Sequence, residues 1–342
     1  MKRILLVTWC AALWSCGGDS AGVNAPDAEV AGDAQSLDAN ATSDALADGG
    51  ALDASTDSST DSSIDSSIDA ADASATDAPI VGNDAPSFDP LSVAGIVLWL
   101  DATKGVTQVG GAVSGWADQT SHGNNAAQAL SIRQPTFSAS SINSKPALHF
   151  NKNHSGNNKG DVLSIADAVS LQWGTGDFYV VVVARFDNVT ATDGPAAFFD
   201  KSFGGTNGGK TVLLLGGVPG AFNNGVTSDG LIANTRVQPG DYVTTTTAYN
   251  NGTPHAFAMQ RVGVELALRV DGLSVASGAS SGVDISNIGG GLGGGSVLIG
   301  ADYNAGGLRL NGDIAEVLAV KGVLNGTDRT ALEGYLKAKY GL

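Results

Sequence analysis

The stretch that most constrains the fold of this chain runs from Gly95 to Asn125. It contains two segments of the same form, Trp99-Leu100-Asp101 and Trp116-Ala117-Asp118, in which a Trp precedes an Asp by two positions. The run that leads into the first segment, Ile96 to Leu100, is apolar at every position, as in a strand that is covered on both faces. The stretch therefore predicts a β protein with Trp99 and Trp116 in its core.

The second segment lies in a short predicted strand, Val113 to Trp116, and Gly110-Gly111 supplies the turn between the two segments. Further along, Phe178 to Phe186 is the most β-prone run of the chain. Because this run is apolar without alternation, we expect a central strand that is covered on both sides. The runs Ala256 to Arg261 and Val264 to Val270 predict a hairpin.

The end of the chain predicts a strand, Gly312 to Val320, followed by a helix. The large side chains of the helix recur at i, i+3, i+4 and i+8, at Leu332, Tyr335, Leu336 and Tyr340. Thr327 is the predicted N-cap and Gly341 the predicted stop. Because the helix has one apolar face, we expect it to lie against the outside of a sheet.

Three motifs together resemble bacterial laminin-G-like and concanavalin A-like jelly-roll domains. They are the paired Trp segments with the polar run Asp118 to Asn125, the run Lys145-Pro146-Ala147-Leu148-His149-Phe150, and the strand before the C-terminal helix. The resemblance covers residues 91–342. It implies an all-β, concanavalin A-like jelly-roll β-sandwich of two antiparallel sheets with a short C-terminal helix, and it implies a cell-surface role without naming a ligand.

The first residues resemble an export signal. Lys2-Arg3 precede an apolar run, Ile4 to Leu13, which is too short to cross a bilayer and is typical of a secretory signal peptide. The segment Leu13-Trp14-Ser15-Cys16-Gly17 resembles a bacterial lipobox, in which the Cys is acylated and becomes the new N-terminus. We expect residues 1–15 to be a lipoprotein signal peptide and Cys16 to anchor the protein at the outer membrane or cell surface. An ordinary signal peptide that is cleaved nearby is the alternative.

Residues 16–90 are nearly all Asp, Ala, Ser, Thr and Gly. Residues 1–90 hold 16 Asp and Glu against 2 Lys and Arg, whereas residues 91–342 hold 18 against 16. Asp recurs every four residues from Asp53 to Asp69, which disfavours a helix, and the segment has too little apolar mass for a core. We expect a disordered acidic tether that spans about 50 Å. The nearly neutral remainder gives no sign of nucleic-acid binding.

The sequence carries no recognisable catalytic pattern. Laminarinase-type hydrolases of the same jelly roll use paired carboxylates in a Glu-x-Asp-x-Glu strand. Residues 91–342 hold three Glu, at 265, 316 and 333, and none stands in that pattern. The four His are scattered without zinc-site spacing. The run Gly278 to Gly282 has the Gly-x-Ser-x-Gly spacing, but it is typical of a loop and not of a nucleophile elbow. We expect a protein that is not an enzyme, and a polysaccharide hydrolase with an atypical site stays an alternative.

Calcium is the one cofactor that the sequence suggests. A short loop gathers carboxylate, amide and carbonyl oxygens, which suit a hard cation, at Asp118, Ser121, Gly123, Asn124 and Asn125. In laminin-G-like relatives a similar loop binds calcium together with a carboxylate from a distant strand. The resemblance gives that role to Asp101 or Asp313. The alternative is that Asp118 and Asn124 cap turns through hydrogen bonds from side chain to backbone.

Sugar binding in such a domain would use exposed aromatic rings on loops. Trp173 and Tyr303 are loop aromatics with polar neighbours, and each is either a platform for a sugar ring or a plug at the edge of the core. We therefore expect a monomeric, surface-displayed, non-catalytic binding lipoprotein whose ligand is a carbohydrate. An adhesive or structural module that binds a surface protein is the alternative.

Overall fold

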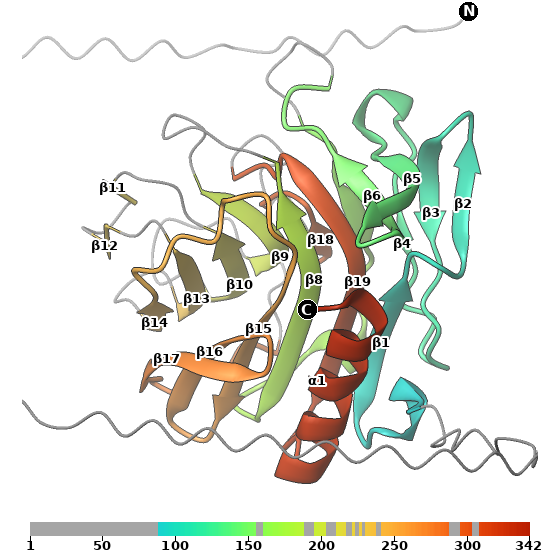
Figure 1. Ribbon diagram of the computed structural model, residues 1–342. Helices are drawn as coiled ribbons and strands as arrows, with labels where there is room; N and C mark the ends of the chain where they lie inside the picture. Colours follow the sequence, from blue (N-terminus) through green and yellow to red (C-terminus); the bar gives the residue numbers. More distant parts are fainter. Residues whose placement is uncertain are drawn as a thin grey trace, which may run out of the picture. The chain divides into compact units, whose positions relative to one another are not determined.

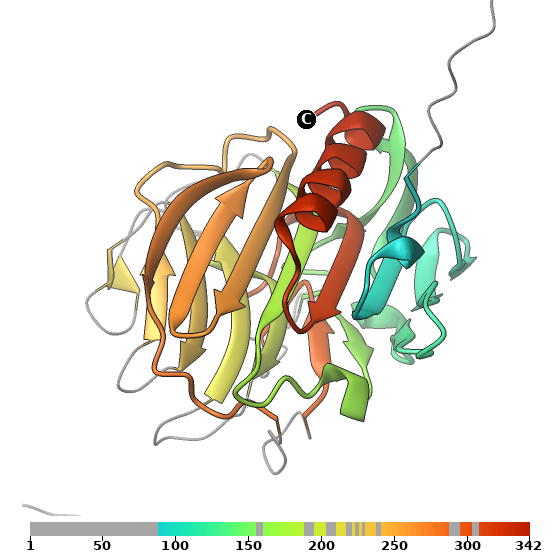
Figure 2. The ribbon, with the colours of Figure 1, turned by 90° about the horizontal axis from the view of Figure 1, so that it is seen from below.

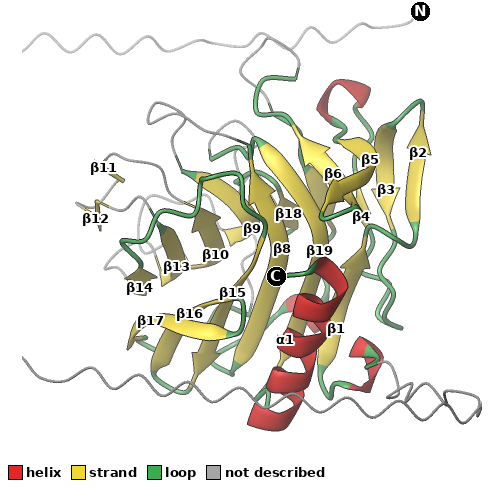
Figure 3. Cartoon of the chain, viewed as in Figure 1, coloured by secondary structure: helices red, strands yellow, loops and turns green. Residues whose placement is uncertain are grey.

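A computed structural model describes residues 88–154, 160–187, 195–202, 210–216, 221–222, 226–227, 230–236, 241–286, 295–302 and 308–342. Strands are the main regular structure in this part of the chain, and one α-helix stands at its C-terminal end (Figure 3). Every strand pairing among these residues is antiparallel. The predictions for the signal peptide, Cys16 and most of the tether concern residues outside this description.

The first layer of the sandwich has the strand order β1-β19-β8-β15-β16-β17 (Figure 1). β6 pairs with the first residues of β19, and β5 pairs with β6. The strands of this layer are β1 (Ile96–Asp101), β5 (Thr136–Ile142), β6 (Lys145–Phe150), β8 (Phe178–Phe186), β15 (His255–Val262), β16 (Glu265–Val270), β17 (Leu273–Ala279) and β19 (Gly312–Lys321).

The second layer has the order β2-β3-β4-β7-β18-β9-β10-β13-β14. A single pairing between β3 and β5 joins it to the first layer, so the hydrogen-bonded sheet is continuous and curls on itself. Its strands are β2 (Val106–Val109), β3 (Ala112–Trp116), β4 (Ala126–Ala127), β7 (Leu163–Ile165), β9 (Ala196–Ser202), β10 (Lys210–Gly216), β13 (Leu231–Arg236), β14 (Asp241–Thr244) and β18 (Val297–Ile299). Two short strands, β11 (Ala221–Phe222) and β12 (Val226–Thr227), pair separately, and the short 3-10 helices are η1 (Pro90–Ser92), η2 (Ser131–Arg133) and η3 (Val169–Leu171).

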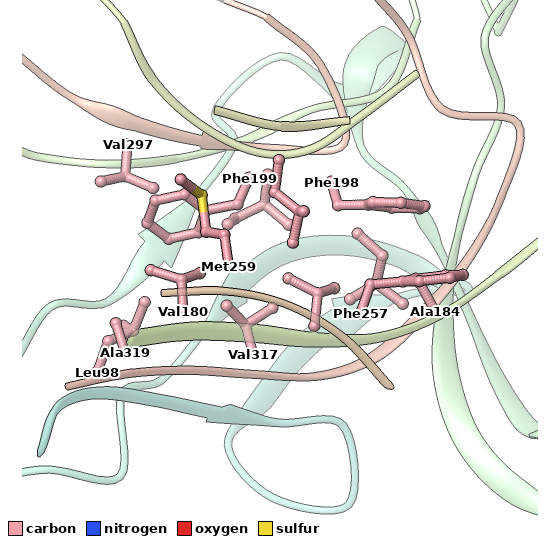
Figure 4. Packing of buried hydrophobic residues seen from close by; sticks show 14 of the residues in the cluster. Leu98, Val180, Ala184, Phe198, Phe199, Phe257, Met259, Val297, Val317 and Ala319 are labelled. Carbon is pink, nitrogen blue, oxygen red and sulfur yellow. The ribbon is translucent and has the colours of Figure 1, made fainter. Parts of the chain in front are cut away.

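The main core lies between the two layers (Figure 4). The first layer contributes buried side chains such as Val180, Phe257 and Val317, and the second contributes Phe198 and Phe199. The rings of Phe198 and Phe257 stack across the interface with their centroids 5.0 Å apart. Such a pair contributes about 0.5–1.5 kcal/mol beyond the burial of its area. This core contains no Cys, so no disulfide contributes to it.

A second core lies on the outer face of the first layer, under helix α1 (Gly326–Tyr340) (Figure 2). Leu332, Leu336 and Tyr340 are buried there, as the spacing predicted. Gly341 ends the helix in the left-handed conformation, also as predicted. The predicted N-cap was wrong by two residues: the Asn325 side chain accepts a hydrogen bond from the Asp328 N–H, and Thr327 lies in the first turn.

Strand β8 is the predicted central strand. It pairs with β15 on one side and with β19 on the other, and its residues alternate between the two cores. The predicted turn at Gly110-Gly111 is present, but it does not lead directly from the first predicted strand to the second. The turn at Gly110-Gly111 joins β3 to β2, whereas β1 pairs with β19 from the far end of the chain. Strand β2 was not predicted from the sequence because its polar residues interrupt the apolar pattern of a strand.

The all-β sandwich with a C-terminal helix is thus confirmed, and Trp99 and Trp116 are buried as predicted. The hairpin of β15 and β16 is confirmed as well. Among the described residues, no helix combines the length and the apolar character that crossing a bilayer requires.

Candidate functional site

A cluster of polar side chains crosses three neighbouring strands of the first layer. The strands are β6, β19 and β8 (Figure 1). His149 of β6 is in register with Asp313 of β19, and Asp313 is in register with Arg185 of β8. Asp187 follows β8 and lies two residues beyond Arg185, and Ser141 comes from β5. We call these five residues the His149 cluster. Because His149, Asp313 and Arg185 stand at directly paired positions, their side chains meet on one face of the sheet.

Asp313 is the centre of the cluster. Its Oδ1 lies 3.0 Å from His149 Nδ1, and its Oδ2 accepts hydrogen bonds from Ser141 Oγ at 2.8 Å and from Arg185 Nε at 2.9 Å. Arg185 Nη2 also donates to that oxygen. Asp313 is buried, whereas the side chains of His149, Asp187 and Arg185 are 35%, 34% and 32% exposed. A buried carboxylate thus holds a cation and an imidazole at the surface.

The charges of the cluster depend on each other. The hydrogen bond with Asp313 raises the pKa of His149 above its ordinary value, and the nearby charges of Asp313, Asp187 and Asp161 act in the same direction against the effect of burial. Burial raises the pKa of Asp313, but its hydrogen bonds with His149, Ser141 and Arg185 outweigh burial and hold the pKa below the ordinary value. The cluster therefore combines a carboxylate that stays ionised with an imidazole that readily carries a proton.

Asp187 sits opposite the free side of the imidazole. Its Oδ2 lies 3.9 Å from His149 Nε2 and 3.3 Å from Asn311 Nδ2, which donates to it. The partly exposed atoms of the cluster therefore comprise guanidinium and imidazole donors beside a carboxylate acceptor. Hydroxyl groups of a sugar can both donate to and accept from such a set.

A second polar network lies under helix α1 and is buried. Glu316 of β19 accepts hydrogen bonds from Trp99 Nε1 at 2.6 Å, from Tyr340 Oη at 2.8 Å and from Lys339 Nζ at 2.7 Å. Lys339 Nζ also lies 2.8 Å from Asp101 Oδ2. Burial raises the pKa of Glu316. The network ties the helix to β1 and β19, so its evident role is to hold the fold.

The other two Glu of the domain lie elsewhere. Glu333 of α1 pairs with Arg269, whose Nε donates to Glu333 Oε1 at 2.6 Å, and Glu265 is exposed at the start of β16. Glu316 is fully buried. Glu316 and Glu333 therefore already have cationic partners, Lys339 and Arg269.

The predicted calcium loop is closed by its own hydrogen bonds. Asp118 Oδ1 accepts from the N–H groups of Trp99 at 2.9 Å and Thr120 at 3.0 Å. Its Oδ2 accepts from Thr120 Oγ1 at 2.7 Å and from the Asn124 N–H at 2.9 Å. Asn125 Oδ1 accepts from the Asp118 N–H at 2.9 Å. These are the bonds of the turn-cap alternative, and the calcium site stays a prediction.

The remaining members of the predicted calcium set are distributed as follows. Asn124 donates its amide to the Val97 carbonyl at 2.7 Å, and Ser121 and Gly123 are exposed in the loop. Asp101 and Asp313, the predicted distant ligands, belong to the network under α1 and to the His149 cluster. Both carboxylates thus already have cationic partners, Lys339 and Arg185.

Of the two predicted aromatic platforms, Trp173 and Tyr303, the first lies among the described residues. Trp173 is 3% exposed, and its ring packs against Phe178 and Phe199 with centroids 5.6 Å and 6.2 Å away. This is the arrangement of a core residue, so its ring faces are covered. Tyr303 lies outside the described residues, as does Cys16.

The His149 cluster was missed in the sequence because its members are spread from residue 141 to residue 313. Their only signal was the presence of His149 and Asp313 in two of the motifs that carry the family resemblance. The spacing of the four His gave no pattern, yet three of them have an Asp partner in the structure: His149 with Asp313, His154 with Asp161, and His255 with Asp271.

Comparisons with known proteins find only distant likenesses. No protein-family model matches the chain, and no curated protein matches it. The binding domain of Paraclostridial Mosquitocidal Protein 1 is 10% identical with a TM-score of 0.46, over 70% of this chain and 52% of that one. Domain 4 of AbnA, a GH43 extracellular arabinanase from Geobacillus stearothermophilus, solved in complex with arabinotriose, is 13% identical with a TM-score of 0.47, over 70% of this chain and 99% of that one.

A structure of botulinum neurotoxin type C, whose cell entry is described as dependent upon interaction with two ganglioside molecules, is 10% identical with a TM-score of 0.44. The match covers 71% of this chain and 51% of that one. This chain thus spans about half the length of the mosquitocidal and botulinum chains. Likeness at this level assigns no ligand and no activity to the chain.

Proposed function

We propose that this protein is a non-catalytic binding lipoprotein, displayed on the bacterial surface, and that it binds carbohydrate through the His149 cluster. The observation that carries the proposal is the set of three partly exposed side chains, His149, Arg185 and Asp187, held around the buried Asp313. Fixed donors and acceptors at a surface are what sugar hydroxyls require for recognition. Charge-assisted hydrogen bonds of this kind are stronger than neutral ones.

The surface display follows from the sequence at the N-terminus. A signal peptide of residues 1–15, acylation at Cys16 and an acidic tether up to residue 90 would place the folded domain outside the cell at the end of a flexible spacer. A binding domain on such a spacer can reach ligands that lie away from its own membrane.

The absence of catalysis belongs to the same proposal. Glu333 and Glu316 are paired with Arg269 and Lys339, and the buried Asp of the cluster, Asp313, is paired with Arg185. A polysaccharide hydrolase would need one carboxylic acid and one nucleophile or base flanking a sugar bond. Release of reducing sugar from a polysaccharide panel by the purified protein would refute this part.

The direct test is a glycan array probed with the purified protein in the presence of a chelator. We expect binding to at least one class of glycan, and we expect the Asp187→Asn variant to lose at least about tenfold in affinity, because one charge-assisted hydrogen bond contributes about 1.5–3 kcal/mol. Glu265→Gln, which changes an exposed residue of another strand, is the matched control.

A second candidate, binding of a surface protein, is favoured by one observation. Strand β17 stands at the edge of the first layer, and its Leu273 and Val275 are 69% and 37% exposed. An exposed edge strand with apolar side chains can accept a strand from a partner. An array without any hit, together with capture of a surface protein that a Val275→Lys variant fails to bind, would favour this candidate over carbohydrate.

A further inference from the structure

The His149 cluster has a feature that sugar binding does not require. The imidazole is held by Asp313 through Nδ1 at 3.0 Å, which leaves Nε2 directed toward Asp187, whose Oδ2 lies 3.9 Å away. When a His binds a metal through one ring nitrogen, its other ring nitrogen commonly donates a hydrogen bond to a carboxylate. Asp313 is such a carboxylate for His149. Among the described residues, His149, Asp187 and Asp313 form the one group of His and carboxylate side chains whose ligand atoms all lie within 4.8 Å of one another.

We infer that His149 Nε2 and Asp187 form a surface site for a divalent ion of the zinc type, in which Asp313 orients His149 and water completes the coordination. Zinc takes His nitrogen and carboxylate oxygen at about 2.1 Å, so two ligands on a tetrahedral ion lie about 3.4 Å apart. The 3.9 Å separation here is close to that value and needs only a small rotation of the exposed Asp187 side chain.

The neighbouring groups decide which ion fits. Arg185 and Ser141 occupy Oδ2 of Asp313, so that oxygen is not open to a metal, and the site offers one imidazole and one carboxylate. A hard cation such as calcium prefers six to eight oxygens, whereas zinc accepts imidazole nitrogen with carboxylate oxygen. With two protein ligands, we expect binding in the micromolar to millimolar range rather than a permanent structural metal.

Binding should compete with a proton. The groups that face His149 are Asp313, Asp187 and Asp161, which favour the imidazolium form, while Arg185 compensates the charge of Asp313. A metal binds only the neutral imidazole, so it must displace the proton from Nε2. Zinc affinity should therefore rise with pH until the imidazole of His149 has lost its proton.

The test is a zinc titration of the full-length protein without glycan, followed by the ring resonances of His149 in NMR and by calorimetry. We expect His149 to shift on zinc addition, and we expect His149→Ala and Asp187→Asn each to weaken the site at least tenfold. His154→Ala is the matched control, because His154 has the same exposure and an Asp partner at 2.6 Å but belongs to no such group among the described residues.

Asp187→Asn keeps the shape of the side chain, so we expect this variant to fold even if the protein does not tolerate the larger change His149→Ala. The inference is overturned if wild type shows no saturable shift at His149 up to millimolar zinc, or if either variant binds zinc as wild type does at this site. Because no glycan is present, neither result bears on the carbohydrate proposal.

Discussion

At the scale of single residues, the structure is organised by buried or half-buried carboxylates that each accept hydrogen bonds from several donors. Asp118 accepts four hydrogen bonds, Asp313 holds His149 and Arg185, and Glu316 holds Trp99, Lys339 and Tyr340. Each joins segments that are distant in the sequence, since Glu316 and Trp99 are 217 residues apart. A buried charge that is satisfied in this way costs little, whereas removal of its partners leaves it unpaired.

The first prediction concerns Asp118. Asp118→Ala should lower the free energy of unfolding by about 2 kcal/mol, because the N–H groups of Trp99, Thr120 and Asn124 lose their acceptor. The loss should be present in chelator, measured by chemical denaturation. A further loss that appears only in calcium would identify Asp118 as an ion ligand, and an unchanged stability in both conditions would contradict the turn role.

The second prediction concerns His149 and pH. The pKa of His149 in the folded protein lies above the ordinary value of 6.5, so the imidazolium contributes stability that is fully present below pH 6.5 and is lost as pH rises through the folded pKa. In chelator, wild type should exceed His149→Gln in stability at pH 6, and the difference should shrink toward pH 9. A difference that stays constant or grows over this range would contradict the ion pair with Asp313.

At the scale of elements, local patterns in the sequence predicted the elements well and their partners poorly. The apolar run of β8, the hairpin of β15 and β16 and the apolar face of α1 are all encoded in spacing, and they are present as expected. The pairing of β1 with β19 is set by packing between the two ends of the chain, which no local pattern contains. The His149 cluster and the network around Glu316 were not predicted for the same reason, since their members lie far apart in the sequence.

The third prediction concerns the start of α1. Asn325→Ala should destabilise the protein by about 1 kcal/mol, because the Asp328 N–H loses its cap. Thr327→Ala, at an exposed position of the first turn, should change stability by no more than about 0.5 kcal/mol. The two variants can be compared by thermal or chemical unfolding. A larger loss of stability from Thr327→Ala than from Asn325→Ala would instead support Thr327 as the N-cap, as the sequence predicted.

At the scale of the whole molecule, an acidic, low-complexity segment, for which we propose export, precedes a nearly neutral β-sandwich. Composition predicts a division into two parts, since residues 16–90 have too little apolar mass for a core and residues 91–342 have enough. The folded part begins no later than Phe88, whose ring lies 5.9 Å from that of Tyr335 of α1. The ligand could not be read from composition, because recognition depends on a few side chains brought together by the fold.

The most direct test of the central claim is the affinity of one bound glycan for wild type, Asp187→Asn and Glu265→Gln, measured by calorimetry in chelator after the array has identified the ligand. The account predicts that wild type and Glu265→Gln bind equally and that Asp187→Asn binds at least tenfold more weakly, with all three melting at similar temperatures. No binding of any glycan by wild type, or equal binding by all three proteins, would contradict it.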